Sequence, residues 1–317
     1  MTAPQDPLSR LSTFSAEKHV VTIGTFDGVH RGHQALIGAA AARSRELDLE
    51  LAAITFDPAP AAVLRPAQFD GAILSLTDKV QLLIAAGAVQ VVVLPFTNAL
   101  AALSAREFFG ALVGQAAMQE LFVGEAFALG HRREGTVDVL AELGAEQDVR
   151  VVALTRIEDD GVIVSSSGIR RVIHAGDVNA ASKMLGRPFH IAGEVIHGAH
   201  IGRTIGYPTA NVMPPEGQAQ LADGIYATMA ALPGGSKPLP AMTYIGTRPA
   251  LNTGRRLIET HILDFDGDLY GQRIEVAFID RLRADADFPS LEDLVAQLQR
   301  DEAATRRALV GVGLCDT

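Results

Sequence analysis

The sequence predicts a parallel α/β head followed by a half built from antiparallel strands and a final helix. Short apolar runs alternate with helical patterns over residues 19–154, which is typical of a parallel sheet with right-handed crossovers. From residue 189 to 279 the apolar runs follow one another closely, with Gly and Pro turns between them and without helical crossovers. This spacing predicts an antiparallel sheet or a closed barrel.

The predicted head starts with a buried strand at His19–Gly24 and an Ala-rich helix at Ala35–Glu46. Ligands of parallel sheets bind at the carboxyl ends of the strands, and residues 25–33 lie at that end of the first strand. Further strands are predicted at Leu51–Phe56, Val89–Leu94, Leu121–Gly124 and Val149–Leu154, and helices at Thr77–Ala86, Ser104–Val113 and Val137–Leu143.

The pattern changes after a short helix and linker at Gly176–Gly186, so we place the domain boundary between residues 182 and 183. The predicted domains are therefore 1–182 and 183–317. The second domain has predicted strands at Phe189–Ile196, Tyr226–Leu232, Ala241–Ile245, Leu257–Leu263 and Ile274–Ile279, and a helix at Leu291–Leu309.

The composition argues against nucleic-acid binding, membrane association and disulfide bonding. The net charge is −10 and no long basic cluster occurs, so we expect no nucleic-acid partner. No apolar run reaches the ~18–20 residues that span a bilayer, and residues 1–6 lack the features of a signal peptide, so we expect no membrane association. Cys315 is the only cysteine, which excludes an intrachain disulfide and fits a cytoplasmic location. Nothing in the sequence indicates the oligomeric state.

A first phosphate-handling motif reads Gly-Thr-Phe-Asp-Gly-Val-His-Arg-Gly-His over residues 24–33. His30 and His33 are three residues apart and share a face at a helix start, where free N–H groups and the helix dipole favour phosphate. Two imidazoles there can stabilise charge that grows on the phosphates of ATP. We therefore predict His30 and His33 as catalytic residues; the competing interpretation is a His-rich turn without a ligand. The predicted phosphate-binding residues of this motif are Gly24, Phe26, Asp27 and Gly28.

A serine-rich segment further along the chain extends this prediction. Ser165, Ser166 and Ser167 precede or begin a helix, and Arg170 follows them. Their hydroxyls and the free N–H groups can hold the outer phosphates of ATP, with Arg170 forming charged contacts. Taken alone, the same serines are better explained as a helix cap, but the motif at residues 24–33 upstream reverses this preference.

A second motif lies in the barrel half, over residues 193–198 and 202–211. Its glycines give backbone room for ATP phosphates, while Thr209 and Asn211 are hard oxygen donors suited to Mg²⁺. No Gly-x-x-x-x-Gly-Lys-Ser/Thr sequence is present, so a P-loop kinase is not supported. The predicted ATP-binding residues of this motif are Gly198, Gly202, Arg203 and Gly206.

Together the two motifs resemble the bacterial bifunctional riboflavin kinase/FMN adenylyltransferase (FAD synthetase) family, from roughly residue 19 to residue 308. The resemblance implies a nucleotidyltransferase-like, Rossmann-like head and a six-stranded Greek-key barrel kinase. It also implies two Mg²⁺-dependent reactions: riboflavin and ATP give FMN in the barrel, and FMN and ATP give FAD and pyrophosphate in the head. The substrates and products are thus small molecules.

The resemblance also assigns residues in the second domain. Residues 259–265, Glu-Thr-His-Ile-Leu-Asp-Phe, are similar to the family's segment whose glutamate accepts the proton of the flavin 5′-hydroxyl, which implies Glu259 as the base. Arg281, Arg283 and Phe288 resemble the family's flavin-binding stretch, although Phe288 also fits a core position.

The head departs from the family pattern at Leu129, where the family has an aromatic residue, mildly at Ser167, where it has Thr, and at two positions that lose a polar side chain. Ala59 stands where the family usually has His, and Ala126 where it usually has Asp or Asn. Alanine cannot form a side-chain hydrogen bond, so a second hypothesis is a riboflavin kinase whose adenylyltransferase head is impaired or altered in specificity. A third is a flavin-binding carrier or regulator without turnover, against which the set of Thr209, Asn211 and Glu259 argues.

Overall fold

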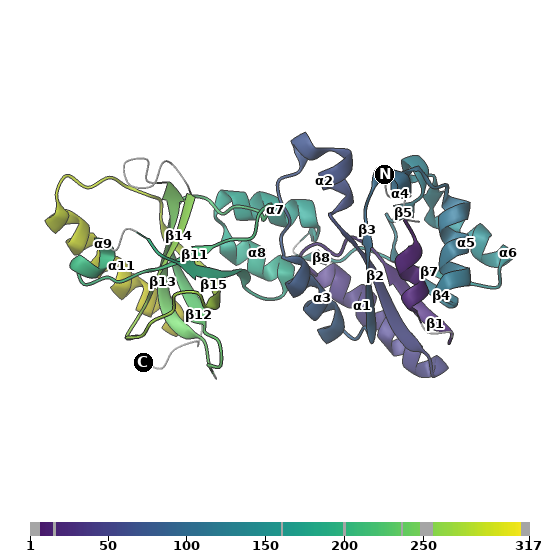
Figure 1. Ribbon diagram of the computed structural model, residues 1–317, viewed down its shortest axis with the longest axis horizontal. Helices are drawn as coiled ribbons and strands as arrows, with labels where there is room; N and C mark the ends of the chain where they lie inside the picture. Colours follow the sequence, from purple (N-terminus) through teal and green to yellow (C-terminus); the bar gives the residue numbers. More distant parts are fainter. Residues whose placement is uncertain are drawn as a thin grey trace. The chain divides into compact units, whose positions relative to one another are not determined.

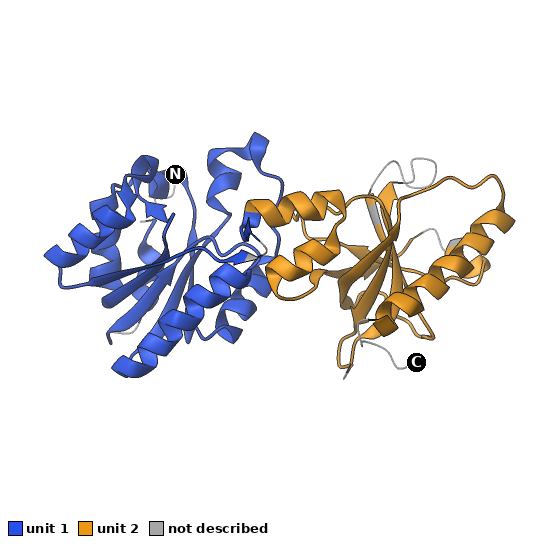
Figure 2. Cartoon of the chain, turned by 180° about the vertical axis from the view of Figure 1, so that it is seen from behind, with its two compact units in different colours: residues 1–166 blue, residues 167–317 orange. Residues whose placement is uncertain are grey.

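The computed structural model describes residues 7–14, 17–159, 161–198, 201–235, 237–247 and 256–311. His200 and Cys315 lie outside these residues. The chain forms two compact units, residues 1–166 and 167–317 (Figure 2). The boundary predicted at 182/183 falls inside helix α8 (Val178–Leu185), which is grouped with the second unit, as is most of α7 (Ser166–Ala175).

The first unit contains a five-stranded sheet in the order β3-β2-β1-β4-β7. All four strand pairs are parallel, which confirms the predicted head. The strands are β1 (His19–Ile23), β2 (Glu50–Asp57), β3 (Gln90–Pro95), β4 (Met118–Gly124) and β7 (Arg150–Leu154). Strand β1 lies between β2 and β4, so the strand order reverses beside it, and ligands bind at such a switch point.

Helices cover the sheet (Figure 1). α5 and α6 pack on the face that carries Val21 and Ile23 of β1, while α1 contacts β1, β2 and β4. The main helices are α1 (Arg31–Leu47), α3 (Leu76–Ala85), α5 (Ala105–Gln115) and α6 (Val137–Glu146). Shorter elements are η1 (Ser9–Thr13), α2 (Pro60–Leu64), η2 (Pro66–Gln68), α4 (Asn98–Ala102), η3 (His131–Arg133), β5 (Ala128–Leu129), β6 (Gly135–Thr136), β8 (Glu158–Asp159) and β9 (Val162–Ile163).

The second unit contains a closed six-stranded barrel in the order β10-β11-β14-β13-β12-β15. All its strand pairs are antiparallel, and β11 to β14 form a Greek key because β11 lies beside β14. The predicted barrel is therefore confirmed. Its elements are β10 (Phe189–Ile196), α9 (Ile201–Thr204), β11 (Ala210–Met213), β12 (Gly224–Ala231), β13 (Leu239–Thr247), β14 (Arg256–Ile262), β15 (Arg273–Arg283) and α11 (Leu291–Gly311).

Aromatic and threonine side chains fill the barrel. The rings of Tyr226 and Phe278 meet edge to face with centroids 5.5 Å apart. Three fully buried threonines form a ladder across neighbouring strands: the hydroxyls of Thr228 and Thr243 lie 2.8 Å apart, and those of Thr243 and Thr260 3.1 Å apart. Each buried hydroxyl thus has a partner. Because alternate strand residues face opposite ways, the neighbour of Thr260, Glu259, projects outward.

Candidate active sites

The head motif forms a strained loop between β1 and α1. Phe26, Gly28 and Val29 have positive φ angles of 48°, 84° and 37°. Backbone strain of this kind persists where the surroundings hold it in place, often at functional sites. The Asp27 carboxylate accepts a hydrogen bond from the Ile73 backbone N–H (2.8 Å), and the Asp27 carbonyl accepts one from the Ser166 hydroxyl (2.8 Å). The loop is therefore fixed at its centre.

The two histidines stack at the end of this loop. Helix α1 starts at Arg31, and His30 is its N-cap, with Nδ1 accepting from the backbone N–H of His33 (3.4 Å). The imidazole centroids are 3.6 Å apart and the rings are nearly parallel, at 17°. Gly32 leaves room beside them, because a Cβ there would lie 3.1 Å from Cε1 of His30 and His30 would have to shift slightly. The motif thus encodes one compact imidazole pair.

His33 is held in its neutral form in the free protein. Burial, and secondarily the neighbouring His30, holds the pKa of His33 well below its ordinary value. Within the described part of the chain, Nδ1 of His33 is buried and has no hydrogen-bond partner. A bound triphosphate would favour the protonated form and give this nitrogen a partner. The geometry suits a His33 that gains charge as phosphate arrives.

The second motif places its polar residues in one row across the outside of the barrel. Asn211 of β11 pairs with Glu259 of β14, and Glu259 pairs with Tyr244 of β13. Residues directly opposite on antiparallel strands share a face, so Asn211, Glu259 and Tyr244 lie side by side. The Tyr244 hydroxyl donates to the Asp285 carboxylate (2.9 Å). The predicted metal donor and the predicted base are therefore brought together.

The loop before Asn211 is held from two directions. His261 Nδ1 donates to the Pro208 carbonyl (2.7 Å), and its ring meets Tyr207 edge to face at 5.1 Å. The Tyr207 hydroxyl donates to Glu302 of α11 (3.4 Å). These contacts hold the backbone of the loop, and Thr209 follows Pro208 directly. Helix α9 is followed by a turn that the Tyr207 N–H closes by donating to the Gly202 carbonyl (2.8 Å), with Gly206 at φ 83°.

Comparison with known proteins identifies both units. The family model described as FAD synthetase matches residues 13–168, and the one described as riboflavin kinase matches residues 185–309. A protein of Escherichia coli K12 named bifunctional riboflavin kinase/FMN adenylyltransferase is 36% identical over 300 residues, which cover 94% of this chain and 95% of the relative. The chain belongs to the bifunctional riboflavin kinase/FMN adenylyltransferase family.

Other members and a solved structure agree with this assignment. A Pseudomonas fluorescens protein of the same name is 39% identical over 289 residues, covering 90% of this chain and 92% of the relative. A Streptococcus pneumoniae crystal structure has a TM-score of 0.85 and 31% identity, covering 93% of this chain and 96% of that one. Its name refers to a macrolide-efflux protein, so we take from it the shared fold alone. Among the described residues, no helix is long and apolar enough to cross a membrane.

The family departure at Ala126 lies in a cavity. A cavity of about 410 Å³ opens beyond the carboxyl ends of β4 and β7. Arg133 lines this cavity, and its Nη2 donates a hydrogen bond to the Ala126 carbonyl (2.9 Å). Ala59, the other departure, follows β2 and is the N-cap of α2. Residues lining the cavity are Glu125, Ala126, Phe127, Ala128, Arg133, Thr136, Val137, Asp138 and Ala153.

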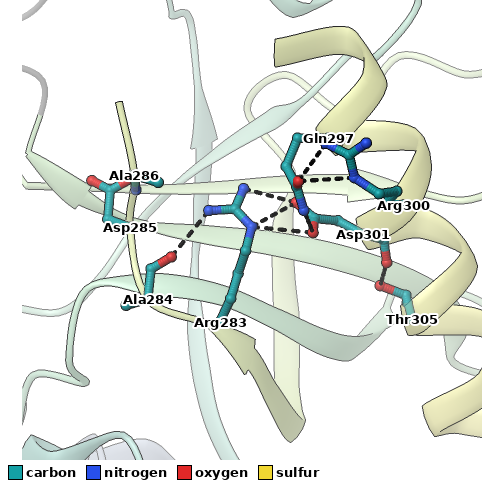
Figure 3. Close-up of polar contacts among 8 residues, drawn as sticks. All are labelled: Arg283, Ala284, Asp285, Ala286, Gln297, Arg300, Asp301 and Thr305. Atoms are coloured by element: carbon teal, nitrogen blue, oxygen red, sulfur yellow. Dashed lines mark hydrogen bonds and ion pairs between the residues drawn. The ribbon is translucent and has the colours of Figure 1, made fainter. Parts of the chain in front are cut away.

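The predicted flavin-binding arginines have protein partners. The guanidinium of Arg283 forms a two-pronged ion pair with Asp301 of α11, with Nη2 2.8 Å from Oδ2 (Figure 3). The ring of Phe288 lies 5.6 Å from this guanidinium. Arg281 donates to the carbonyls of Ala175 (3.2 Å) and Asp223 (2.8 Å). Arg283 therefore connects strand β15 to α11, and Arg281 connects the same strand to the end of α7 and to the loop at Asp223. Contact of either arginine with flavin stays a prediction.

The serine-rich segment is divided between the units. Ser166 is bonded to Asp27 of the head loop, and Ser165 precedes it. Ser167 and Arg170 lie in α7 on the other side of the division, so their role at the head phosphates stays a prediction. Sequence reasoning gave no role to Lys79, although the spacing of Lys79 and Leu83 puts this lysine on the buried face of α3.

We expect Gly198→Ala to impair the kinase site selectively. A Cβ at Gly198 would overlap the side-chain amide of Asn211, so the Asn211 side chain must move from its present place in the row with Glu259. A displacement of about 1 Å at a reacting centre can cost about 100-fold, and we expect a loss of about that size in FMN formation. Steady-state kinetics of riboflavin phosphorylation check this. Gly311→Ala is the matched control because a Cβ there meets nothing within 4 Å. Equal rates in the two variants would contradict the assigned site.

We expect His33 to make the head less stable in mild acid. Because its pKa is lowered on folding, the unfolded chain binds the proton more tightly, so stability falls as the pH drops from about 6.5 towards the folded-state pKa. The slope contributed is at most about 1.4 kcal/mol per pH unit. Hydrogen exchange of β1 amides at pH 7 and pH 5, compared with His33→Gln, measures it. An equal change in both proteins would contradict the prediction.

Proposed function

We propose that this chain converts riboflavin to FMN in the barrel unit and FMN to FAD in the head unit, using ATP twice. The observation that carries the proposal is that each unit holds a complete phosphate-handling motif with its proposed reactive side chains side by side. The two family models, one on each unit, support it. A cytoplasmic location is part of the proposal and rests on the absence of a possible disulfide.

In the barrel, the riboflavin 5′-hydroxyl oxygen attacks the γ-phosphorus of ATP, and the bond from that phosphorus to ADP breaks. Glu259 orients the hydroxyl and accepts its proton late in the transfer. Asn211 lies opposite Glu259 and offers a neutral oxygen, and Thr209 carries a hydroxyl two residues earlier in the chain, so this donor set fits Mg²⁺. When bound, Mg²⁺ would neutralise charge on the transferring phosphate.

In the head, a phosphate oxygen of FMN attacks the α-phosphorus of ATP, and the bond to pyrophosphate breaks. His30 and His33 donate hydrogen bonds to the oxygens on which charge grows. The N-terminal amides of α1 supply further donors, since His30 caps this helix end. No residue of the chain needs to form a covalent intermediate in this scheme.

Two separate assays test the proposal. Purified protein receives riboflavin, ATP and Mg²⁺ in one assay, and FMN, ATP and Mg²⁺ in the other. We expect ADP and FMN from the first, and pyrophosphate and FAD from the second. Flavin binding without ATP consumption in either assay would instead favour a carrier or regulator.

A second candidate function is a kinase with an impaired or altered head, which Ala59 and Ala126 motivate. Ala126 lines the cavity beyond β4 and offers only its backbone carbonyl, already bound to Arg133. Under this hypothesis Ala126→Asn restores a polar contact and raises FAD output from FMN several-fold, measured by chromatography. Unchanged output from this variant beside an active wild-type protein would count against it.

A further inference from the structure

Lys79 is a buried lysine next to the adenylyltransferase loop. It is the fourth residue of α3, only 7% exposed, and it shares the buried face of this helix with Leu83. Lysine is rarely buried unless its ammonium is paired, because desolvating a charge is costly. Among the described residues, the hydrogen-bond partners of the Lys79 ammonium are carbonyls, while the carboxylates of Asp27 and Asp57 act on it at longer range. Burial accordingly lowers its pKa from the ordinary value.

The ammonium instead binds two backbone carbonyls at the carboxyl edge of the sheet. Nζ donates to the Phe56 carbonyl near the end of β2 (2.8 Å) and to the Thr25 carbonyl just after β1 (3.5 Å). The Thr25 carbonyl also accepts from the hydroxyl of Thr55, which is fully buried (3.1 Å). The side chains of Lys79 and Thr55 thus both donate to the carbonyl of Thr25.

That peptide group is where the strained loop begins. Phe26, the next residue, has a positive φ of 48° and a ring that meets His33 edge to face at 5.3 Å. A shift at Thr25 therefore moves Phe26 and, through it, the packing of the imidazole pair. A fixed start is what a loop with unfavourable backbone angles needs, because it would otherwise relax.

We propose that Lys79 is a positioning residue for adenylyl transfer: its buried ammonium ties the ends of β1 and β2 together and thereby sets the place of the loop that carries Asp27 and His30. This inference rests on the proposed function of the head. It assigns Lys79 no contact with substrate.

The test is Lys79→Met, which keeps the length of the side chain and removes its charge and its hydrogen-bond donors. The control is Lys18→Met, an exposed lysine in the same unit. We expect kcat for FAD formation from FMN to fall about 100-fold in Lys79→Met, with KM for FMN within about threefold of wild type. Lys79→Arg restores the charge and the hydrogen-bond donors. Its kcat should therefore be at least about fivefold higher than that of Lys79→Met. Riboflavin phosphorylation by the same molecules should not change.

A merely structural role gives a different pattern. Lys79→Met would then unfold more easily but retain kcat per folded head, as counted by protection of β1 amides from hydrogen exchange, and that result would overturn the inference. If Lys79→Met does not fold, Lys79→Gln decides, because it keeps a side-chain N–H donor but removes the charge and shortens the reach to the carbonyls of Phe56 and Thr25. A folded Lys79→Gln protein with wild-type kcat would overturn the inference, while a lowered kcat at unchanged KM would support it. Wild-type protein that makes no FAD would instead overturn the proposed function of the head.

Discussion

Replacing Glu259 by alanine should abolish most FMN formation while leaving FAD formation from FMN intact. The carboxylate is the one acidic group in the row that joins β11, β14 and β13, and it lies directly across from Asn211. A general base contributes about 100- to 10,000-fold, so we expect kcat for riboflavin phosphorylation to fall by at least about 100-fold. Chromatography of the flavins formed from riboflavin and ATP measures this.

The controls for Glu259 use the same chain. Glu216→Ala removes an exposed glutamate from a turn in the same unit and should leave both activities unchanged. In Glu259→Ala, conversion of supplied FMN to FAD reports that the protein is folded and the head is active. Full FMN formation by Glu259→Ala would show that the assigned base is wrong.

Replacing His30 or His33 by alanine should have the opposite effect, with FAD formation lost and FMN formation kept. Loss of a preorganised donor to a developing negative charge costs about 100- to 1000-fold, and we expect a loss of this size from each variant. The double variant should lose little more than the single ones, because the stacked rings form one unit. Pyrophosphate release from FMN and ATP measures the effect.

His30→Ala also removes a helix cap, so stability must be followed alongside activity. The expected cost of the lost cap is about 1 kcal/mol, which a folded head tolerates. His30→Asn keeps a side-chain acceptor for the N–H of His33 and separates the two effects: it should stay as stable as wild type and still fail to make FAD. Untouched FAD formation in both alanine variants would remove the head assignment.

Local patterns in the sequence predicted most of the fold. The alternation of strands and helices predicted the parallel sheet, and closely spaced strands predicted the barrel, because these patterns depend on neighbouring residues. The predicted start of α1, at Ala35, was four residues late. Residues 31–34 carry no apolar pattern, and the capping bond of His30 depends on the orientation of its ring, which the sequence does not reveal. Strand β11 was not predicted as a strand because its four residues gain their extended form from pairing with β10 and β14.

The candidate sites show the same limit. Motifs predicted that Asn211 and Glu259 belong to one site, and the strand register brings them together. The partner of Arg283 could not be predicted, because Asp301 lies on a helix later in the chain and the pair depends on how α11 packs against the barrel. Lys79 was overlooked because a lysine is normally exposed, and only tertiary packing shows its carbonyl partners.

We propose two working sites in one chain, used in series. The first experiment is a time course with riboflavin as the only flavin, in excess ATP and Mg²⁺, with the flavins separated by chromatography. We expect FMN to accumulate first and FAD to follow from it, with one ADP and one pyrophosphate released for each FAD. FMN that accumulates without any FAD would contradict the claim.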